Sequence, residues 1–185
     1  MRELALHLLD IAENSISARA KNIIIEVAEN TKTDRLHMSV QDDGIGMDAE
    51  TVSRVVDPFF TTRTTRKVGL GIPLLKAAAE ACNGYLRLES TPGHGTRLDV
   101  EFQNSHIDRM PLGDLPGTIL PLVVGSPNVH WVFKYSIDNH TFVFDDEPIK
   151  KELDGISLTE PDVLAFLRDY LKEGITDIKI KQSLL

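Results

Sequence analysis

Residues 36–46 read LHMSVQDDGIG, a strand pattern that leads straight into an Asp-x-Gly-x-Gly turn. Apolar side chains at every second position of residues 36–41 predict a β-strand with one buried face. Asp42, Gly44 and Gly46 follow directly at the end of this strand. Glycines let a backbone pass close to a flat ligand, and a carboxylate accepts a hydrogen bond from an exocyclic amine. Taken alone, the pattern is also common in ordinary turns.

Helical and strand patterns alternate on both sides of this stretch. An amphipathic helix is predicted before it, over residues 4–18, and a strand follows over residues 22–29. The elements predicted after it are a short helix capped by Asp48, a helix over residues 72–82, and strands over residues 85–90 and 96–102. This order predicts an α+β fold, a two-layer α/β sandwich.

The first predicted helix carries a polar pair, Asp10 and Asn14. Side chains four residues apart lie on the same face of a helix. A carboxylate and an amide oxygen one turn apart are suited to holding a magnesium ion and a water molecule. On its own the pair has a simpler interpretation, because polar residues at this spacing usually form a solvated helix face.

Two further features follow the Asp-x-Gly-x-Gly turn. Residues 61–67 hold three cations and no acid, and they lead to Gly69 and Gly71, which open a helix. Hydroxyls, cations and the N–H groups of a helix N-terminus suit a polyphosphate, although a solvated basic loop would have the same composition. The tight turn of residues 93–96 then places the hydroxyl of Thr96 at the start of a strand.

In order and spacing, these four features resemble the motifs of the superfamily of histidine kinases, gyrase, heat-shock chaperones and MutL, whose ATP-binding domain has the Bergerat-type fold. The resemblance covers about residues 1–103 and implies binding of ATP or ADP with Mg²⁺. It makes Asn14 the magnesium ligand, Asp42 the reader of the adenine amine, and Thr96 a hydroxyl that supports adenine through water. It also implies that residues 61–68 form a short lid. The other nucleotide-binding positions that it implies are Ser17, Gly44, Ile45, Gly46, Met47, Arg63, Arg66, Lys67, Gly69, Leu70, Gly71 and Gly95.

The sequence departs from a histidine kinase in two respects. A sensor kinase normally carries a helical hairpin with its phosphoacceptor histidine ahead of this domain, whereas here the helix with Asn14 starts the chain, so autophosphorylation on histidine is not expected. Ser17 stands where histidine kinases often have lysine, and residues 14–18 look more like the MutL pattern. In the hydrolysing members a glutamate four residues before the asparagine acts as the base. Asp10 is the candidate catalytic residue at that place, and its shorter side chain predicts slow turnover.

Several functions stay open at this stage. The first is a stand-alone kinase, related to the anti-sigma serine kinases, that phosphorylates a partner protein. The second is an ATP-gated switch whose lid closure is read by a partner without phosphotransfer, or a slow ATPase. A MutL-like repair ATPase is disfavoured, because a basic DNA-binding surface and the transducer domain are lacking.

Residues 104–185 are predicted to form a separate small C-terminal module of unknown role. Four prolines within residues 104–129 predict an extended linker or loop-rich insert. The strands predicted next are residues 130–137 and 141–145, joined at Asp138 and Asn139, followed by an amphipathic helix that ends at Gly174. Trp131, Phe133 and Tyr135 alternate on one strand face and are predicted to be core residues.

The amino-acid composition indicates which classes of partner and which cell compartment to expect. The net charge is −8, which argues against nucleic-acid binding, because that function requires a basic face. No run approaches the roughly 20 apolar residues of a membrane span, and the single cysteine, Cys82, fits a reducing compartment. We therefore expect a cytoplasmic protein with no membrane segment. A protein partner is expected, and a homodimer is compatible with the sequence.

Overall fold

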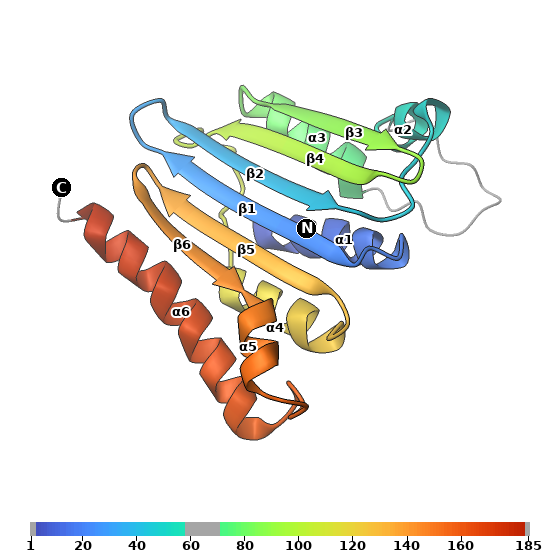
Figure 1. Cartoon of the computed structure of the whole chain (residues 1–185). Coiled ribbons are helices and arrows are strands. Elements are labelled where there is room, and N and C mark those ends of the chain that lie inside the picture. The colour runs from blue at the N-terminus through green and yellow to red at the C-terminus, as the bar shows by residue number, and fades with distance from the viewer. Residues whose placement is uncertain (1–2, 58–70, 184–185) are drawn as a thin grey trace.

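The computed structural model describes residues 3–57 and 71–183, which build one six-stranded sheet backed by helices (Figure 1). The strand order is β3-β4-β2-β1-β5-β6. β1 and β5 pair in parallel, and the other neighbouring strands pair antiparallel. The strands are β1 (Asn22–Asn30), β2 (Arg35–Asp42), β3 (Tyr85–Thr91), β4 (Gly95–Gln103), β5 (His130–Ile137) and β6 (His140–Asp145).

The helices form the second layer. They are α1 (Leu4–Ser17), α2 (Ala49–Val55), α3 (Gly71–Ala81), α4 (Leu115–Gly125), α5 (Asp146–Glu152) and α6 (Pro161–Ser183). In Figure 1, α1, α3 and α4 lie behind the sheet, and α6 runs beside β6. The predicted two-layer α/β sandwich is confirmed. Among the described residues, no helix is both long enough and apolar enough to cross a membrane.

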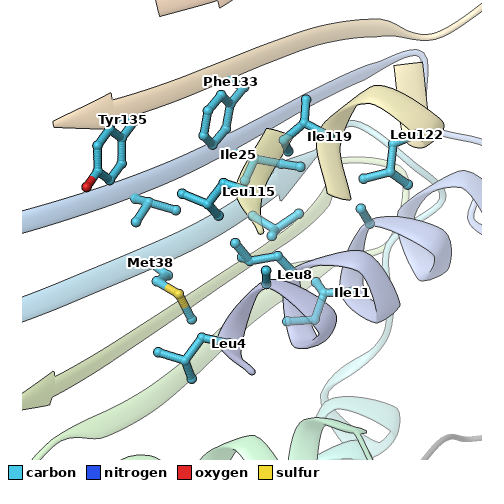
Figure 2. Close-up of a cluster of buried hydrophobic side chains, with 14 of the residues drawn as sticks. Leu4, Leu8, Ile11, Ile25, Met38, Leu115, Ile119, Leu122, Phe133 and Tyr135 are labelled. Carbon is cyan, nitrogen blue, oxygen red and sulfur yellow. The ribbon is translucent and has the colours of Figure 1, made fainter. Parts of the chain in front are cut away.

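The core lies between the sheet and these helices (Figure 2). Helices α1 and α4 and the strands contribute the buried side chains of this core. From the helices come Leu4, Leu8 and Ile11 of α1 and Leu115, Ile119 and Leu122 of α4. From the strands come Ile25, Met38, Phe133 and Tyr135, which face the helices. Trp131, Phe133 and Tyr135 are almost completely buried, so their predicted place in a core is confirmed.

The C-terminal strands belong to the same sheet as the N-terminal ones. Residues 22–29 of β1 pair in register with residues 130–137 of β5, and the two predicted strands of the C-terminal part form the hairpin β5–β6. Asp138, in its turn, has a φ of 50°, which short polar side chains tolerate. The division of the chain at residue 103 into independent units stays a prediction, although both parts contribute to one sheet and one core.

The predicted linker over residues 104–129 is wrong where α4 forms. Asp114 caps this helix, because its Oδ1 accepts from the Gly117 N–H at 2.9 Å. Pro116 falls in the first turn, where a missing N–H costs no helical hydrogen bond. Leu115, Ile119 and Leu122 are buried, and that burial offsets the hydrogen bond lost at Pro121 inside the helix.

The predicted end of the last helix at Gly174 is also wrong, because α6 continues to Ser183. A Cβ atom at Gly174 would lie 2.1 Å from Cε2 of Phe142 in β6. Glycine at this position therefore lets the helix pass close to the sheet and does not end it. The short helix α5 between β6 and α6 had no counterpart in the sequence prediction.

Candidate functional site

A cavity of about 240 Å³ opens between α1, the ends of β2 and β4, and the loop of residues 43–47, which we call the glycine loop. Six predicted nucleotide-binding residues line it: Asn14, Asp42, Ile45, Gly46, Met47 and Thr96. Ile11, Val40 and Leu98 add apolar side chains to the wall. A mostly apolar cavity with a few convergent polar groups is typical of small-molecule sites.

Asp42 is the buried polar group of this cavity, with only 8% of its surface exposed. Its Oδ1 accepts a hydrogen bond from the Gly44 N–H at 2.9 Å, and its Oδ2 accepts one from the Ser15 hydroxyl at 2.6 Å. Ionised carboxylate oxygens offer about four acceptor positions between them, so acceptor capacity remains toward the cavity. Asp42 can therefore receive a donor from a ligand.

The neighbouring Asp43 has a structural role and does not line the cavity. Its Oδ1 accepts from the backbone N–H groups of Lys21 and Asn22, at 2.7 and 2.9 Å, and its Oδ2 accepts from the Asn22 side-chain amide at 2.6 Å. Burial acts to raise the pKa of Asp43, but the hydrogen bonds from Asn22 and Lys21 outweigh it, so this pKa lies below its ordinary value. Asp43 thus anchors the start of β1, while Asp42 faces the cavity.

Two glycines of the predicted motifs let chain segments approach one another around the cavity. Gly46 has a φ of 67°, and a Cβ there would lie 2.0 Å from the Thr91 carbonyl oxygen. Gly95 has a φ of 86°, and its Cβ would lie 1.9 Å from the Asp42 carbonyl oxygen. The glycine loop is further joined to the β3–β4 turn by the Gly93 N–H, which donates to the Ile45 carbonyl at 2.7 Å. These contacts hold the cavity wall close to the strand that carries Asp42.

Thr96 stands opposite Asp42 in the β2–β4 register. Its hydroxyl lies 2.8 Å from the hydroxyl of Ser90, which also accepts from the Met47 N–H at 2.8 Å. Sequence reasoning did not find Ser90. Its place just before the β3–β4 turn was visible, but its cross-strand pairing with Thr96 was not.

α1 brings Asn14 to the cavity but not Ser17. Asn14 is exposed and lines the opening. Ser17 is exposed, and its hydroxyl donates to the Glu13 carbonyl of its own helix at 2.9 Å. Asp10 is partly buried, one turn before Asn14, and is not among the cavity-lining residues. The predicted positions Arg63, Arg66, Lys67, Gly69 and Leu70, and the lid of which they are part, lie outside the described residues.

The side chain of His7 in α1 contacts the start of α3. The side chain is only 3% exposed, and its Nδ1 has no hydrogen-bond partner among residues 3–57 and 71–183. Burial lowers the pKa of His7 below its ordinary value, while the charge of Asp10 and a hydrogen bond to the backbone of Gly71 act in the opposite direction. His7, with a lowered pKa, therefore lies between the helix of Asp10 and Asn14 and the predicted position Gly71.

A second polar cluster lies at the start of β5. Ligand atoms of His130, Asp145 and Asp146 lie within 4.8 Å of one another. Asp146 is already engaged, because its Oδ1 accepts from the Trp131 N–H at 2.9 Å and its Oδ2 pairs with Lys150 Nζ at 2.6 Å. His130 Nε2 lies 2.9 Å from Asp145 Oδ1. These contacts explain the cluster as an anchor between β5, β6 and α5.

Comparison with known proteins identifies the class. Residues 2–106 match the family described as histidine kinase-, DNA gyrase B-, and HSP90-like ATPase. The match spans more than half of the chain, so the chain belongs to this family, and the predicted superfamily is confirmed. The matched residues form a histidine-kinase-like ATP-binding domain.

The curated relatives include bacterial sensor kinases. The chain is 44% identical over 88 residues to sensor protein kinase FleS of Pseudomonas aeruginosa, which covers 48% of this chain and 22% of that protein. It is 34% identical over 100 residues to the signal transduction histidine-protein kinase AtoS of Escherichia coli, covering 54% of this chain and 16% of AtoS. It is 27% identical over 175 residues to sensor histidine kinase AtsR of Burkholderia thailandensis, covering 90% of this chain and 27% of AtsR. The chain thus spans less than a third of the length of these relatives.

Solved structures share the fold at low sequence identity. The N-terminal domain of a DNA repair protein superposes with a TM-score of 0.56 at 15% identity, covering 77% of this chain and 52% of that one. The Aquifex aeolicus MutL ATPase domain complexed with ADP superposes with a TM-score of 0.50 at 16% identity, covering 83% of this chain and 68% of that one. Both alignments extend beyond residue 106, so the likeness of fold reaches into the C-terminal part.

Proposed function

We propose that this protein binds Mg-ATP in the cavity between α1 and the glycine loop and acts as a kinase-related regulatory protein that transfers phosphate to a partner. The observation that carries the proposal is the buried Asp42 in the wall of a mostly apolar cavity. Apolar walls suit an adenine ring, and an acceptor carboxylate suits its exocyclic amine.

The described residues that line the cavity have the chemistry to bind an adenine base and a magnesium ion. Asp42 receives the adenine amine, and Thr96, whose hydroxyl is hydrogen-bonded to that of Ser90, lines the cavity beside it. Asn14, exposed at the cavity opening, presents an amide oxygen as a magnesium ligand. The magnesium ion, when bound, neutralises phosphate charge.

Asp10 is the proposed catalytic carboxylate. It lies on α1 one turn before Asn14, so the two side chains share a helix face. From there the carboxylate is suited to orienting a water molecule or a partner's hydroxyl and accepting its proton. Because aspartate is one methylene shorter than glutamate, we expect slow turnover.

The experiment follows the fate of the nucleotide. Purified protein is incubated with ATP labelled at the γ-phosphate and Mg²⁺, and ADP, free phosphate and protein-bound label are quantified. We expect ADP to form with wild type and not with Asp10→Asn, while Glu173→Gln, which removes an exposed carboxylate from the distant α6, behaves as wild type. Equal ADP formation by wild type and Asp10→Asn would remove Asp10 from the catalytic role.

A second candidate is an ATP-gated switch without phosphotransfer, and the packing at the start of α1 favours it. The N–H groups of Leu4 and Ala5 donate to the carbonyls of Pro111 and Leu112, at 3.0 and 2.9 Å. The helix that carries Asn14 at its other end is thus attached to the segment that leads into α4. Intact ATP retained at about one molecule per chain, with no ADP formed, would favour the switch.

We propose a cytoplasmic protein that works with a protein partner and does not bind nucleic acid, in keeping with its net charge of −8. We also propose that the protein forms a homodimer, which sedimentation of the protein with and without Mg-ATP would test.

A further inference from the structure

We propose that Ser15 is a positioning residue that sets the preference of this cavity for adenine by holding the carboxylate of Asp42. The inference rests on the proposed nucleotide binding and adds the residue that makes the base readout selective. Ser15 lies in α1 immediately after Asn14, within the stretch of residues 14–18 that resembles the MutL pattern, and no role was predicted for it from the sequence.

The Ser15 hydroxyl has one proton and two possible acceptors. It lies 2.6 Å from Asp42 Oδ2 and 3.4 Å from the Ile11 carbonyl oxygen of its own helix. A hydroxyl–carboxylate distance of about 2.5–2.7 Å is characteristic of a charge-assisted hydrogen bond, which is roughly twice as strong as a neutral one. The proton is therefore donated to Asp42.

Asp42 is held on both of its oxygens by different parts of the chain. Ser15 of α1 donates to Oδ2, and the Gly44 N–H of the glycine loop donates to Oδ1 at 2.9 Å. Rotation of the carboxylate breaks both hydrogen bonds at once. Ser15 and Asp42 are 3% and 8% exposed, so their hydrogen bond is largely shielded from bulk water although both residues line the cavity.

A carboxylate held in this way presents only acceptors to the cavity. The 6-amino group of adenine donates to it, whereas the 6-oxo group of hypoxanthine places an acceptor against a negative charge. A carboxylate that is free to turn away discriminates less between the two bases. Ser15 therefore acts on the difference between the bases and not on the phosphate end of the site.

The test compares ATP with inosine triphosphate, which has the same ribose and phosphates but a 6-oxo purine. Dissociation constants with Mg²⁺ are measured by calorimetry for wild type, Ser15→Ala and Thr176→Ala. The control removes a hydroxyl that donates at 2.7 Å to the Lys172 carbonyl within α6, far along the chain from the cavity. We expect Ser15→Ala to weaken ATP binding by about tenfold and inosine triphosphate binding by less than about threefold, because the loss falls on a hydrogen bond to a charged group. Thr176→Ala should leave both constants unchanged.

A second measurement needs no nucleotide. If Ser15 holds Asp42, its loss also loosens the bond from the Gly44 N–H, so we expect amide exchange at Gly44 to be at least about fivefold faster in nucleotide-free Ser15→Ala than in wild type.

The outcomes separate this inference from the proposed function. Wild type that binds no ATP would refute the nucleotide function and this inference with it. Wild type that binds ATP, together with a Ser15→Ala variant whose ratio of the two dissociation constants is unchanged, would refute the role of Ser15 alone. Equal weakening of the binding of both nucleotides is one such case, because it would mean that Ser15 supports the whole cavity and not base recognition.

Discussion

The substitution Gly174→Ala tests the close contact between α6 and β6. A Cβ atom added at Gly174 would lie 2.1, 2.3 and 2.4 Å from three atoms of the Phe142 ring. This ring packs edge-on against Tyr170, with 5.6 Å between the ring centroids, and Tyr170 also contacts Phe144. Phe142 therefore has little room to turn away, and either α6 moves outward or the aromatic group repacks.

Two opposing effects set the magnitude. Replacing glycine by alanine inside a helix stabilises it by about 1 kcal/mol when nothing obstructs the new methyl group. Overpacking of a well-filled contact costs about 1–3 kcal/mol. The expected net result for Gly174→Ala is a free energy of unfolding lower by about 1 kcal/mol, and a Tm lower by about 2–4 °C. Gly125→Ala is the matched control, because in the described part of the chain no atom beyond its chain neighbours and its own helix backbone lies within 4 Å of the added Cβ, and we expect its stability to be unchanged or slightly higher.

The assay is urea and thermal unfolding followed by circular dichroism, with both variants beside wild type. The same substitution is then made in a Phe142→Leu background. There Gly174→Ala should no longer destabilise, because the ring that obstructs the methyl group is gone. A Gly174→Ala protein that is more stable than wild type would refute the packing of α6 over Phe142.

Three further predictions concern the site. Asn14→Ala should abolish the part of ATP affinity that depends on Mg²⁺, so that calorimetry in magnesium and in EDTA gives the same dissociation constant; a persistent magnesium effect would contradict the assignment of this ligand. Asp42→Asn should weaken ATP binding by about 10- to 100-fold with unchanged circular dichroism, because a hydrogen bond to a charged group is worth about 1.5–3 kcal/mol, and wild-type affinity would show that the base is read elsewhere. His7→Gln should remove a pH dependence of stability. Burial holds the pKa of His7 below 6.5, so the unfolded chain binds the proton more readily than the folded one. The wild type therefore loses stability as the pH falls below 6.5, by at most about 1.4 kcal/mol per pH unit. Urea midpoints of the two proteins that fall in parallel from pH 7.5 to 5.5 would assign the loss to other groups.

The elements of the N-terminal part were predictable from the sequence because each has a strong local signal. The helical spacing of Leu4, Leu8 and Ile11 predicted α1, and the alternation of residues 36–41 predicted β2. The predicted cap of α2 is also present, since Asp48 Oδ1 accepts from the Thr51 N–H at 2.7 Å. These signals depend on neighbours within a few residues, so a single sequence carries them.

The errors in the C-terminal part have a common cause. Four prolines over residues 104–129 and a glycine at position 174 are locally signals of irregular structure. Pro121 is tolerated inside α4 because Leu115, Ile119 and Leu122 are buried, and Gly174 is tolerated inside α6 because Phe142 occupies the space of its missing side chain. In both places tertiary packing outweighs local preference.

Some residues of the candidate site were likewise predictable from the sequence, and others were not. Asn14, Asp42 and Thr96 were recognisable from residue type, spacing and family resemblance, and the structure brings all three to one cavity. The partners that hold Asp42 and Thr96 were not recognisable, because Ser15 lies 27 residues from Asp42 and meets it only once α1 packs against the sheet. Ser90 meets Thr96 only through the pairing of β3 with β4.

The sequence therefore determined the kinds of element, the order of the motifs and the residues with the chemistry to bind a nucleotide, because periodicity, caps and turns are properties of short segments. The tertiary structure decided how α4, β5 and α6 complete the core, which oxygen of Asp42 each donor reaches, and why Gly174 lies inside a helix. Contacts between residues far apart in the chain depend on strand register and on the close packing of helices against the sheet, and both are set by the whole chain at once.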